Sequence, residues 1–179
     1  DHLERHGTVE AYRAIKRGLL ERSDHAIFNA DDPDLRQQRQ SWTGGAWVSA
    51  ESAQPDGQPA DLWINGEGWV RDRSQPLFPA EALAMPGGHN RQNLLLVTAA
   101  ARQIGLSPAS IEAGLRSFPG VPHRLEPLGR IRNAQVFNDS KATNYDAAAV
   151  GLKAMQGPVA VLAGGSTKQG DASSWLAEP

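Results

Sequence analysis

The sequence predicts an α/β fold, and three observations lead to this class. Apolar runs of strand length, at residues 25–29 and 158–163, each end in polar or glycine-rich residues. Segments between such runs repeat apolar residues at helical spacing, as in residues 9–22. The polar residues 138–144 stand where a strand pattern changes into a helical one. Ligands of open α/β sheets bind at the carboxyl ends of strands, so we interpret this turn as a candidate site.

Length and composition restrict the class of protein. A chain of 179 residues and 19.2 kDa holds one large or two small domains with a substantial core. The absence of cysteine excludes disulfides and thiolate metal sites and fits a reducing compartment. The net charge of −2 argues against a nucleic-acid partner. No apolar run approaches the roughly 18 residues of a membrane span, so we expect a soluble protein.

Both ends of the sequence indicate a fragment of a longer protein. The chain begins at Asp1 without a methionine and ends at Pro179 while a helical pattern is under way. No signal peptide opens it, and it contains no P-loop of the form G-x-x-x-x-G-K-[ST]. We therefore expect further domains outside this sequence.

The first predicted helix covers residues 9–22. Thr8 is a suitable N-cap, and Glu10 lies in the first turn, where the helix dipole favours an acid. Lys16 falls within the apolar stripe of this helix, whose other members are Val9, Tyr12, Ile15, Leu19 and Leu20. A lysine there either extends its ammonium group to the edge of the stripe or is desolvated. In the second case its neutral amine can take up carbon dioxide as a carbamate.

A buried strand is predicted at residues 25–29, followed by a turn at Asp31, Asp32 and Pro33. The two carboxylates would suit a metal ion. A turn at the end of a strand, with a cap for the next helix, explains them more simply. We therefore leave both aspartates out of the candidate site.

The section from residue 41 to 86 has a β-like, loop-rich pattern. Short strands are predicted on both sides of residues 65–68, which form a hairpin turn. Trp63 and Trp69 are candidates for packing across this hairpin. We interpret the whole section as scaffold.

A helix that is apolar almost all round is predicted at residues 94–104, and we expect it to be buried. Asn90 and Asn93 lie three residues apart and share a face of its first turn. A capped, buried helix explains Asn90 but explains Asn93 less well. Ser107 and the proline after it begin the next helix, through residues 111–115.

Two prolines and a glycine in residues 118–122 mark the expected domain boundary. Arg124 follows directly, and its planar guanidinium suits polyphosphate because it donates hydrogen bonds in pairs. An exposed arginine in a linker is the alternative. Residues 125–131 and 135–137 predict two strands joined by a turn.

Residues 138–144 offer complementary polar groups. Asp139 can accept from a ribose hydroxyl or hold the water of a cation, Lys141 can meet a phosphate or carboxylate, and Thr143 can donate through its hydroxyl. Asn144 is a suitable cap for the helix that follows. On composition alone, an ordinary polar loop with an asparagine cap explains these residues equally well.

A second polar turn, Gly-Gly-Ser-Thr-Lys at residues 164–168, follows the apolar strand at residues 158–163. It resembles a phosphate loop, but Gln169 follows Lys168 where that motif has serine or threonine. A glycine-rich turn with a solvated lysine is the alternative interpretation.

The heptapeptide at residues 138–144, Asn-Asp-Ser-Lys-Ala-Thr-Asn, resembles the signature of the D-glutamate-adding branch of the Mur ligase family. Other members of that family carry a different loop at this place. Four further stretches match in the same order, at residues 1–5, 12–16, 88–93 and 122–126. The resemblance therefore covers essentially the whole chain.

The resemblance implies a cytoplasmic, bacterial, monomeric ligase of peptidoglycan precursor synthesis that uses ATP and Mg²⁺. Such an enzyme joins D-glutamate to UDP-N-acetylmuramoyl-L-alanine through an acyl phosphate. Residues 1–121 would belong to a P-loop-type central ATP-binding domain, with the P-loop itself absent from this sequence. Residues 122–179 would begin a Rossmann-like C-terminal domain that binds the amino acid.

The same resemblance implies roles in binding magnesium and ATP. His2 and a carbamate on Lys16 would be ligands of a second magnesium ion. Asn93 would contact adenine, with Asn90 and His89 supporting the turn.

The remaining implied roles lie in the C-terminal part. Arg124 would reach the nucleotide phosphates, Asp139 would belong to the ATP site and Lys141 to the catalytic groups. Thr143 and Lys168 would hold a carboxylate of D-glutamate.

Two other functions stay open at this point. One is a related Mur or folylpolyglutamate-type ligase that adds another amino acid. The other is a nucleotide- or metabolite-binding module without chemistry of its own. Because the P-loop is absent, we expect the 179-residue chain alone to be inactive.

Overall fold

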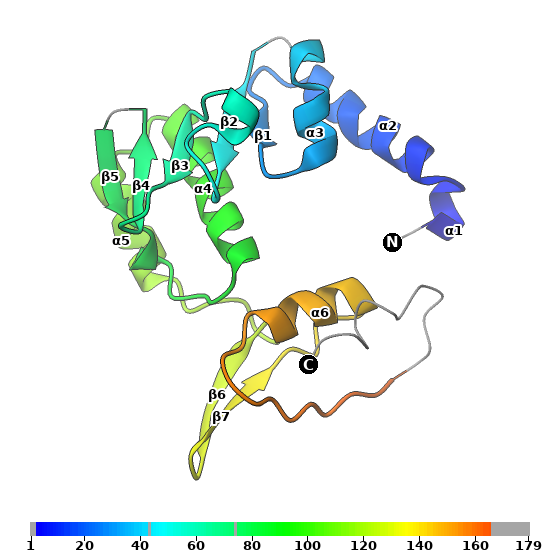
Figure 1. Cartoon of the computed structure of the whole chain (residues 1–179), viewed down its shortest axis with the longest axis vertical. Helices are drawn as coiled ribbons and strands as arrows, with labels where there is room; N and C mark the ends of the chain where they lie inside the picture. The colour runs from blue at the N-terminus through cyan, green and yellow to red at the C-terminus, as the bar shows by residue number, and fades with distance from the viewer. Residues whose placement is uncertain (1–2, 43, 74, 166–179) are drawn as a thin grey trace. The chain divides into compact units, whose positions relative to one another are not determined.

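The computed structural model describes residues 3–42, 44–73 and 75–165 (Figure 1). The chain divides into two compact units. The first contains Asp1–Leu83 and Arg91–Arg116, and the second contains Ala84–Asn90 and Ser117–Pro179. The short segment Ala84–Asn90 thus belongs with the C-terminal part of the chain, although it lies far from it in sequence.

Within the described residues, the first unit is built on a five-stranded sheet with strand order β1-β2-β3-β4-β5. The strands are β1 (Ile27–Asn29), β2 (Ala46–Ser49), β3 (Leu62–Ile64), β4 (Trp69–Asp72) and β5 (Gln75–Pro79). β1, β2 and β3 are parallel neighbours, whereas β4 and β5 join in antiparallel pairs. The predicted α/β class is confirmed, and β5 is a strand that the sequence pattern did not predict.

The hairpin between β3 and β4 turns at residues 65–68, as predicted. The register pairs Trp63 with Arg71 and Trp69 with Pro79 of β5, so the two indoles are not direct cross-strand partners. They are diagonal neighbours on one face of the hairpin, and their packing against each other stays a prediction.

The helices that lie wholly or mostly in the first unit are α1 (Leu3–His6), α2 (Val9–Glu21), α3 (Pro33–Gln37), α4 (Gly88–Gln103) and α5 (Pro108–Ser117), with short 3₁₀ turns at Arg39–Ser41, Pro55–Gly57 and Ala80–Ala82. The first three residues of α4 and the last of α5 belong to the second unit. The predicted caps are confirmed. The Thr8 hydroxyl oxygen accepts from the Ala11 N–H at 3.1 Å, and the Ser107 hydroxyl oxygen accepts from the Ser110 N–H at 3.1 Å. None of the helices in the described part of the chain is long and apolar enough to cross a membrane.

The main core of the first unit lies between the sheet and one face each of α4 and α5 (Figure 1). Helix α4 contributes Leu94, Leu95 and Ala99, each no more than 2% exposed. Val97 on the same helix is 54% exposed. The expectation that this helix is buried all round is therefore wrong, because the sheet covers only one of its faces.

A smaller aromatic cluster lies between β1 and β2. The rings of Phe28 and Trp47 stack with centroids 4.7 Å apart, and Trp42 packs against Phe28 at 4.9 Å. Gly45 stands beside this cluster with a φ of 91°, and a Cβ there would come within 2.5 Å of the Phe28 ring. The close approach of backbone to ring therefore requires glycine.

The second unit is built from β6 (Glu126–Ile131), β7 (Ala134–Asn138) and α6 (Tyr145–Lys153). β6 and β7 form the predicted antiparallel hairpin. The predicted cap of α6 is confirmed, since Asn144 Oδ1 accepts from the Ala147 N–H at 2.7 Å. Residues 139–144 form the turn from strand to helix, as the sequence pattern indicated.

The predicted strand at residues 158–163 is wrong. This segment has no regular secondary structure, and Leu162 is fully exposed. An apolar run becomes a strand only where another strand offers backbone partners. No such partner occurs for this run within the described residues.

Candidate functional site

The first predicted site residue, Lys16, lies on α2 and is exposed. Its ammonium nitrogen is 5.5 Å from the centroid of the Tyr12 ring. None of the residues of α2 is buried, and the apolar Ile15 and Leu19 are 59% and 64% exposed. Of the two alternatives for Lys16, desolvation in a buried stripe is therefore wrong for the described residues, because Lys16 is exposed and Leu20 is the member of that stripe that packs against a core cluster.

A shallow groove of about 220 Å³ between α2 and α3 includes Lys16, Asp32 and Asp34. Asp32 is the cap of α3 and accepts from the N–H groups of Asp34 and Leu35. The Asp34 carboxylate pairs with the Arg13 guanidinium. Both carboxylates near Lys16 thus have structural partners, and the described residues contain no group of three potential metal ligands.

Asp31, left out of the candidate site, has a structural role. Its carboxylate accepts from the Ser49 hydroxyl at 2.5 Å and from the Ala50 N–H at 2.8 Å. These bonds join the end of β1 to the end of β2. Together with the cap at Asp32, they confirm the simpler interpretation of the two aspartates.

The two asparagines at the start of α4 have different surroundings. Asn90 is 2% exposed, and its side-chain N–H donates to the Pro86 carbonyl at 2.6 Å. Asn93 is exposed. Asn90 therefore supports the turn before α4, as implied, while the amide of Asn93 lies at the surface, where a ligand can reach it.

In the second unit, two motifs that are apart in sequence are held together. The Lys141 N–H donates to the His123 carbonyl at 3.0 Å. The Leu125 N–H donates to Asp139 Oδ1 at 3.0 Å. The segment that carries Arg124 and the loop that carries Lys141 therefore form one piece of structure.

The polar loop presents some of its side chains to solvent and turns one inward. Lys141 and Thr143 are exposed, as is Arg124. Asp139 is half-buried, with one carboxylate oxygen bonded to the Leu125 N–H and the other against Gly151 of α6. The cations of Arg124 and Lys141 and the hydroxyl of Thr143 thus remain accessible to an anionic ligand. The Asp139 carboxylate instead accepts a hydrogen bond from the backbone.

The charged groups of this cluster, together with burial, change the pKa of His89. Burial lowers the pKa of His89, and the nearby Arg124 cation lowers it further, while Asp139 acts in the opposite direction. Gly87 packs closely against the imidazole, because a Cβ there would come within 2.8 Å of the His89 ring. The imidazole is thus held in the second unit beside Arg124 and favours its neutral form.

Sequence reasoning missed two residues of this cluster. The Glu126 carboxylate accepts from the His123 N–H at 2.8 Å, and a Cβ at Gly151 would come within 2.5 Å of Asp139. The bond between His123 and Glu126 spans only three residues, but it accompanies a positive φ at His123 that the sequence does not indicate. Asp139 and Gly151 lie on different elements, so no local pattern reveals their contact. A glycine inside a helix was the available signal, since glycine is unfavourable there without a packing reason. The predicted site residues His2 and Lys168 lie outside the described residues.

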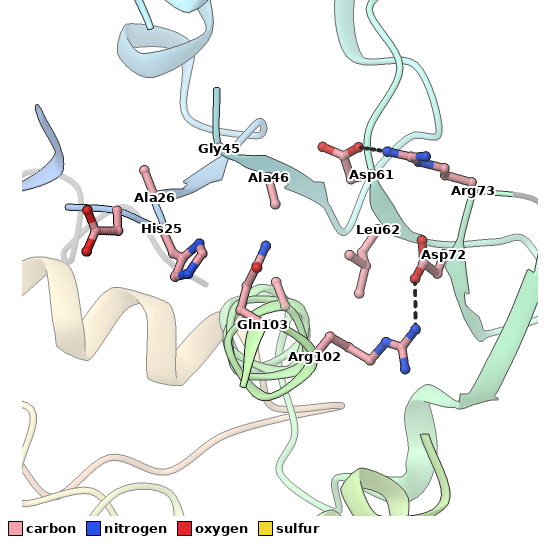
Figure 2. Close-up of a pocket in the computed structure, with 12 residues that line it drawn as sticks. His25, Ala26, Gly45, Ala46, Asp61, Leu62, Asp72, Arg73, Arg102 and Gln103 are labelled. Atoms are coloured by element: carbon pink, nitrogen blue, oxygen red, sulfur yellow. Dashed lines mark ion pairs between the residues drawn. The ribbon is translucent and has the colours of Figure 1, made fainter. Parts of the chain in front are cut away.

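A pocket of about 460 Å³ lies in the first unit and contains none of the predicted site residues (Figure 2). Two ion pairs cross its lining, Arg102 with Asp72 at 3.6 Å and Arg73 with Asp61 at 3.7 Å. Its charged groups are therefore largely paired with one another, and we assign no ligand to it.

Comparisons with known proteins agree with the resemblance in the motifs. The family model of the Mur ligase middle domain matches residues 1–101. A protein of Parasynechococcus marenigrum (strain WH8102) named UDP-N-acetylmuramoylalanine–D-glutamate ligase is 93% identical over 178 residues, which are 99% of this chain and 38% of that protein. A protein of the same name from Synechococcus sp. (strain CC9605) is 74% identical over 176 residues, 98% of this chain and 38% of its own length. The chain thus spans about 38% of the curated relatives that it matches.

A solved structure supports the fold. The crystal structure of the UDP-N-acetylmuramate-alanine ligase MurC from Thermotoga maritima aligns with a TM-score of 0.62 at 21% identity. The alignment covers 86% of this chain and 35% of that one.

Proposed function

The chain belongs to the Mur ligase family, and we propose that it is part of an ATP-dependent ligase that joins D-glutamate to UDP-N-acetylmuramoyl-L-alanine. The observation that carries this proposal is the bond between the Lys141 N–H and the His123 carbonyl. It holds the heptapeptide of the D-glutamate-adding branch against the segment of Arg124. The names of the 93% and 74% identical relatives support the same amino acid.

The proposed reaction has two steps. A carboxylate oxygen of UDP-N-acetylmuramoyl-L-alanine attacks the γ-phosphorus of ATP, the bond from that phosphorus to the bridging oxygen breaks, and ADP leaves. The amine of D-glutamate then attacks the acyl carbon, loses a proton and displaces inorganic phosphate. The first step spreads negative charge over the phosphoryl oxygens. The exposed guanidinium of Arg124 and ammonium of Lys141 are suited to offset that charge.

The remaining residues receive proposed roles in binding. The exposed amide of Asn93 contacts adenine, and the buried amide of Asn90 holds the turn before it. Thr143 and Lys168 hold a carboxylate of D-glutamate. Asp139 stays a predicted member of the ATP site, acting through the backbone that it holds.

The proposed division of labour follows the two parts of the chain. Residues 1–121 belong to the ATP-binding domain, and residues 122–179 begin the domain that binds the amino acid. Acting as part of a monomeric cytoplasmic enzyme, they serve peptidoglycan synthesis.

The resemblance also implies a magnesium ion and a carbamate on Lys16. Magnesium neutralises phosphate charge when it is bound, and His2 and Lys16 are the ligands that the resemblance implies. The described residues give Lys16 no apolar enclosure that would favour a neutral amine, so we derive no step through either group. If a carbamate nevertheless forms, Lys16→Ala in the full-length protein abolishes activity. Bicarbonate then fails to restore it, whereas short carboxylates restore part; wild-type rates would rule out the carbamate.

The ligase proposal is tested by following ADP release from the full-length protein. ADP should appear only when UDP-N-acetylmuramoyl-L-alanine, ATP and D-glutamate are all present. A binding module without chemistry would retain ATP and release no ADP under any combination. The 179-residue chain alone is predicted to release none, and turnover by it would refute that part.

A further inference from the structure

The backbone on both sides of Arg124 has an unusual conformation. His123 has a φ of 65° and Leu125 has a φ of 44°, although neither is glycine. Residues with side chains rarely occupy this left-handed region, and they persist there only where surrounding contacts impose it. Arg124 is therefore held between two residues whose conformation depends on outside support.

Two carboxylates supply that support. Glu126 Oε2 accepts from the His123 N–H at 2.8 Å, and Asp139 Oδ1 accepts from the Leu125 N–H at 3.0 Å. Hydrogen bonds from backbone N–H groups to carboxylates are stronger than those to neutral acceptors. Each carboxylate therefore fixes one of the two left-handed residues that flank Arg124.

Further bonds fix His123 from its other side. Its carbonyl accepts from the Lys141 N–H at 3.0 Å, and its ring Nδ1 lies 2.8 Å from the Asn138 amide nitrogen. Among the ion pairs of the described residues, none contains the Arg124 guanidinium. The surrounding groups thus bind the backbone of this segment and leave the guanidinium available.

We infer that Glu126, together with Asp139, is a positioning residue that aims Arg124 at an anionic ligand without touching that ligand. This inference rests on the proposed function, in which the ligand is the phosphate chain of ATP. A long, exposed arginine loses conformational freedom when it binds, and a backbone already fixed on both sides reduces that loss. The same bonds hold the loop of Lys141 and Thr143 in a fixed position relative to Arg124.

Kinetics of the full-length protein test the positioning role. Glu126→Ala removes the acceptor for the His123 N–H and should raise the KM for ATP at least fivefold. Glu126→Gln keeps a carbonyl acceptor and should stay within twofold of wild type. Glu112→Ala is a matched control, because it removes a half-buried glutamate paired with Arg116 on α5. It should leave the KM for ATP unchanged.

A double variant separates positioning from general structural damage. If Glu126 acts through Arg124, then Glu126→Ala should have no additional effect on the KM for ATP in an Arg124→Ala background. If the increase in the KM for ATP in the double variant equals the product of the increases in the two single variants, the inference is overturned. A Glu126→Gln variant as defective as Glu126→Ala would overturn it too, since the hydrogen bond would then not be the cause.

Hydrogen exchange without substrates tests the bonds independently of the ligase activity. Glu126→Ala should accelerate exchange of the His123 amide at least tenfold, and Asp139→Ala should do so for the Leu125 amide. Unchanged rates would overturn the inference even in an active enzyme. If these rates rise but the wild-type protein releases no ADP with all substrates, the proposed function fails, and with it the role of aiming Arg124 at ATP.

Discussion

Gly151 in α6 allows a sharp test of how the loop and the helix of the second unit fit together. Alanine is normally the better residue inside a helix, by about 1 kcal/mol relative to glycine. At Gly151, however, a Cβ would come within 2.5 Å of Asp139 Oδ2, far inside ordinary contact. The nearby Leu125 side chain, 3.6 Å from that Cβ, imposes no such conflict. The sign of the effect of Gly151→Ala therefore depends on the Asp139 carboxylate.

The size of the effect follows from the bond that Asp139 must give up. Moving the carboxylate away from the new methyl group weakens its hydrogen bond with the Leu125 N–H, which measures 3.0 Å. Hydrogen bonds to charged groups contribute about 1.5–3 kcal/mol. After subtracting the gain of about 1 kcal/mol in helix propensity, Gly151→Ala should destabilise α6 by about 0.5–2 kcal/mol. In an Asp139→Ala background the same change should stabilise α6 by about 1 kcal/mol.

Hydrogen–deuterium exchange of the α6 amides is the appropriate assay, because it reports the free energy of opening of this element alone. The four proteins of the cycle are wild type, the two single variants and the double variant. The predicted coupling energy between Gly151 and Asp139 is about 1.5–3 kcal/mol. Stabilisation of α6 by Gly151→Ala to the same extent in both backgrounds would refute the packing described here.

Three further predictions concern stability. Gly45→Ala should destabilise the first unit by more than about 2 kcal/mol in urea unfolding, because the new Cβ would overlap the Phe28 ring at a φ of 91°; a loss under 0.5 kcal/mol would contradict this. Thr8→Ala should cost about 1 kcal/mol through the lost cap of α2, visible as faster amide exchange in its first turn; Thr8→Ser should preserve it. The pKa of His89 is lowered in the folded state, so as the pH falls, His89 becomes protonated in the unfolded chain at a higher pH than in the folded protein. The contribution of neutral His89 to the free energy of unfolding is complete above the ordinary pKa of 6.5 and is lost as the pH falls through the lowered pKa. Wild type should therefore lose more stability than His89→Gln between pH 7.5 and 5.5, and equal losses would show that His89 does not titrate as described.

Local features of the fold were predictable because their causes are local. Thr8, Ser107 and Asn144 cap helices through residues three positions further on. The hairpin at residues 65–68 and the turn between β6 and β7 depend on short segments in the same way.

The failures involve partners that are distant in sequence. The apolar stripe around Lys16 and the run at residues 158–163 both have the composition of buried elements, yet within the described residues most of their apolar side chains are exposed. Periodicity identifies an apolar face but does not say what packs on it. The position of Trp69 opposite Pro79 depended on β5, which no alternation in the sequence had indicated.

The candidate site shows the same division. The residue types at 138–144 and their place between strand and helix could be predicted, since the pattern changes period there. The partner of Asp139 could not, because Leu125 and Gly151 come beside it only through the hairpin and α6. The partner of Glu126 is only three residues away, but its role was hidden because the sequence does not indicate the left-handed backbone of His123.

The amino acid that the full-length protein couples to UDP-N-acetylmuramoyl-L-alanine tests the central claim most directly. The protein would be supplied with ATP and an equimolar mixture of D-glutamate, L-glutamate, L-alanine and meso-diaminopimelate, and the nucleotide product identified by mass and chirality. Incorporation of D-glutamate, abolished or strongly reduced by Thr143→Val, is the predicted result. Preferential incorporation of any other amino acid, or none, would contradict the assignment of the loop at residues 138–144.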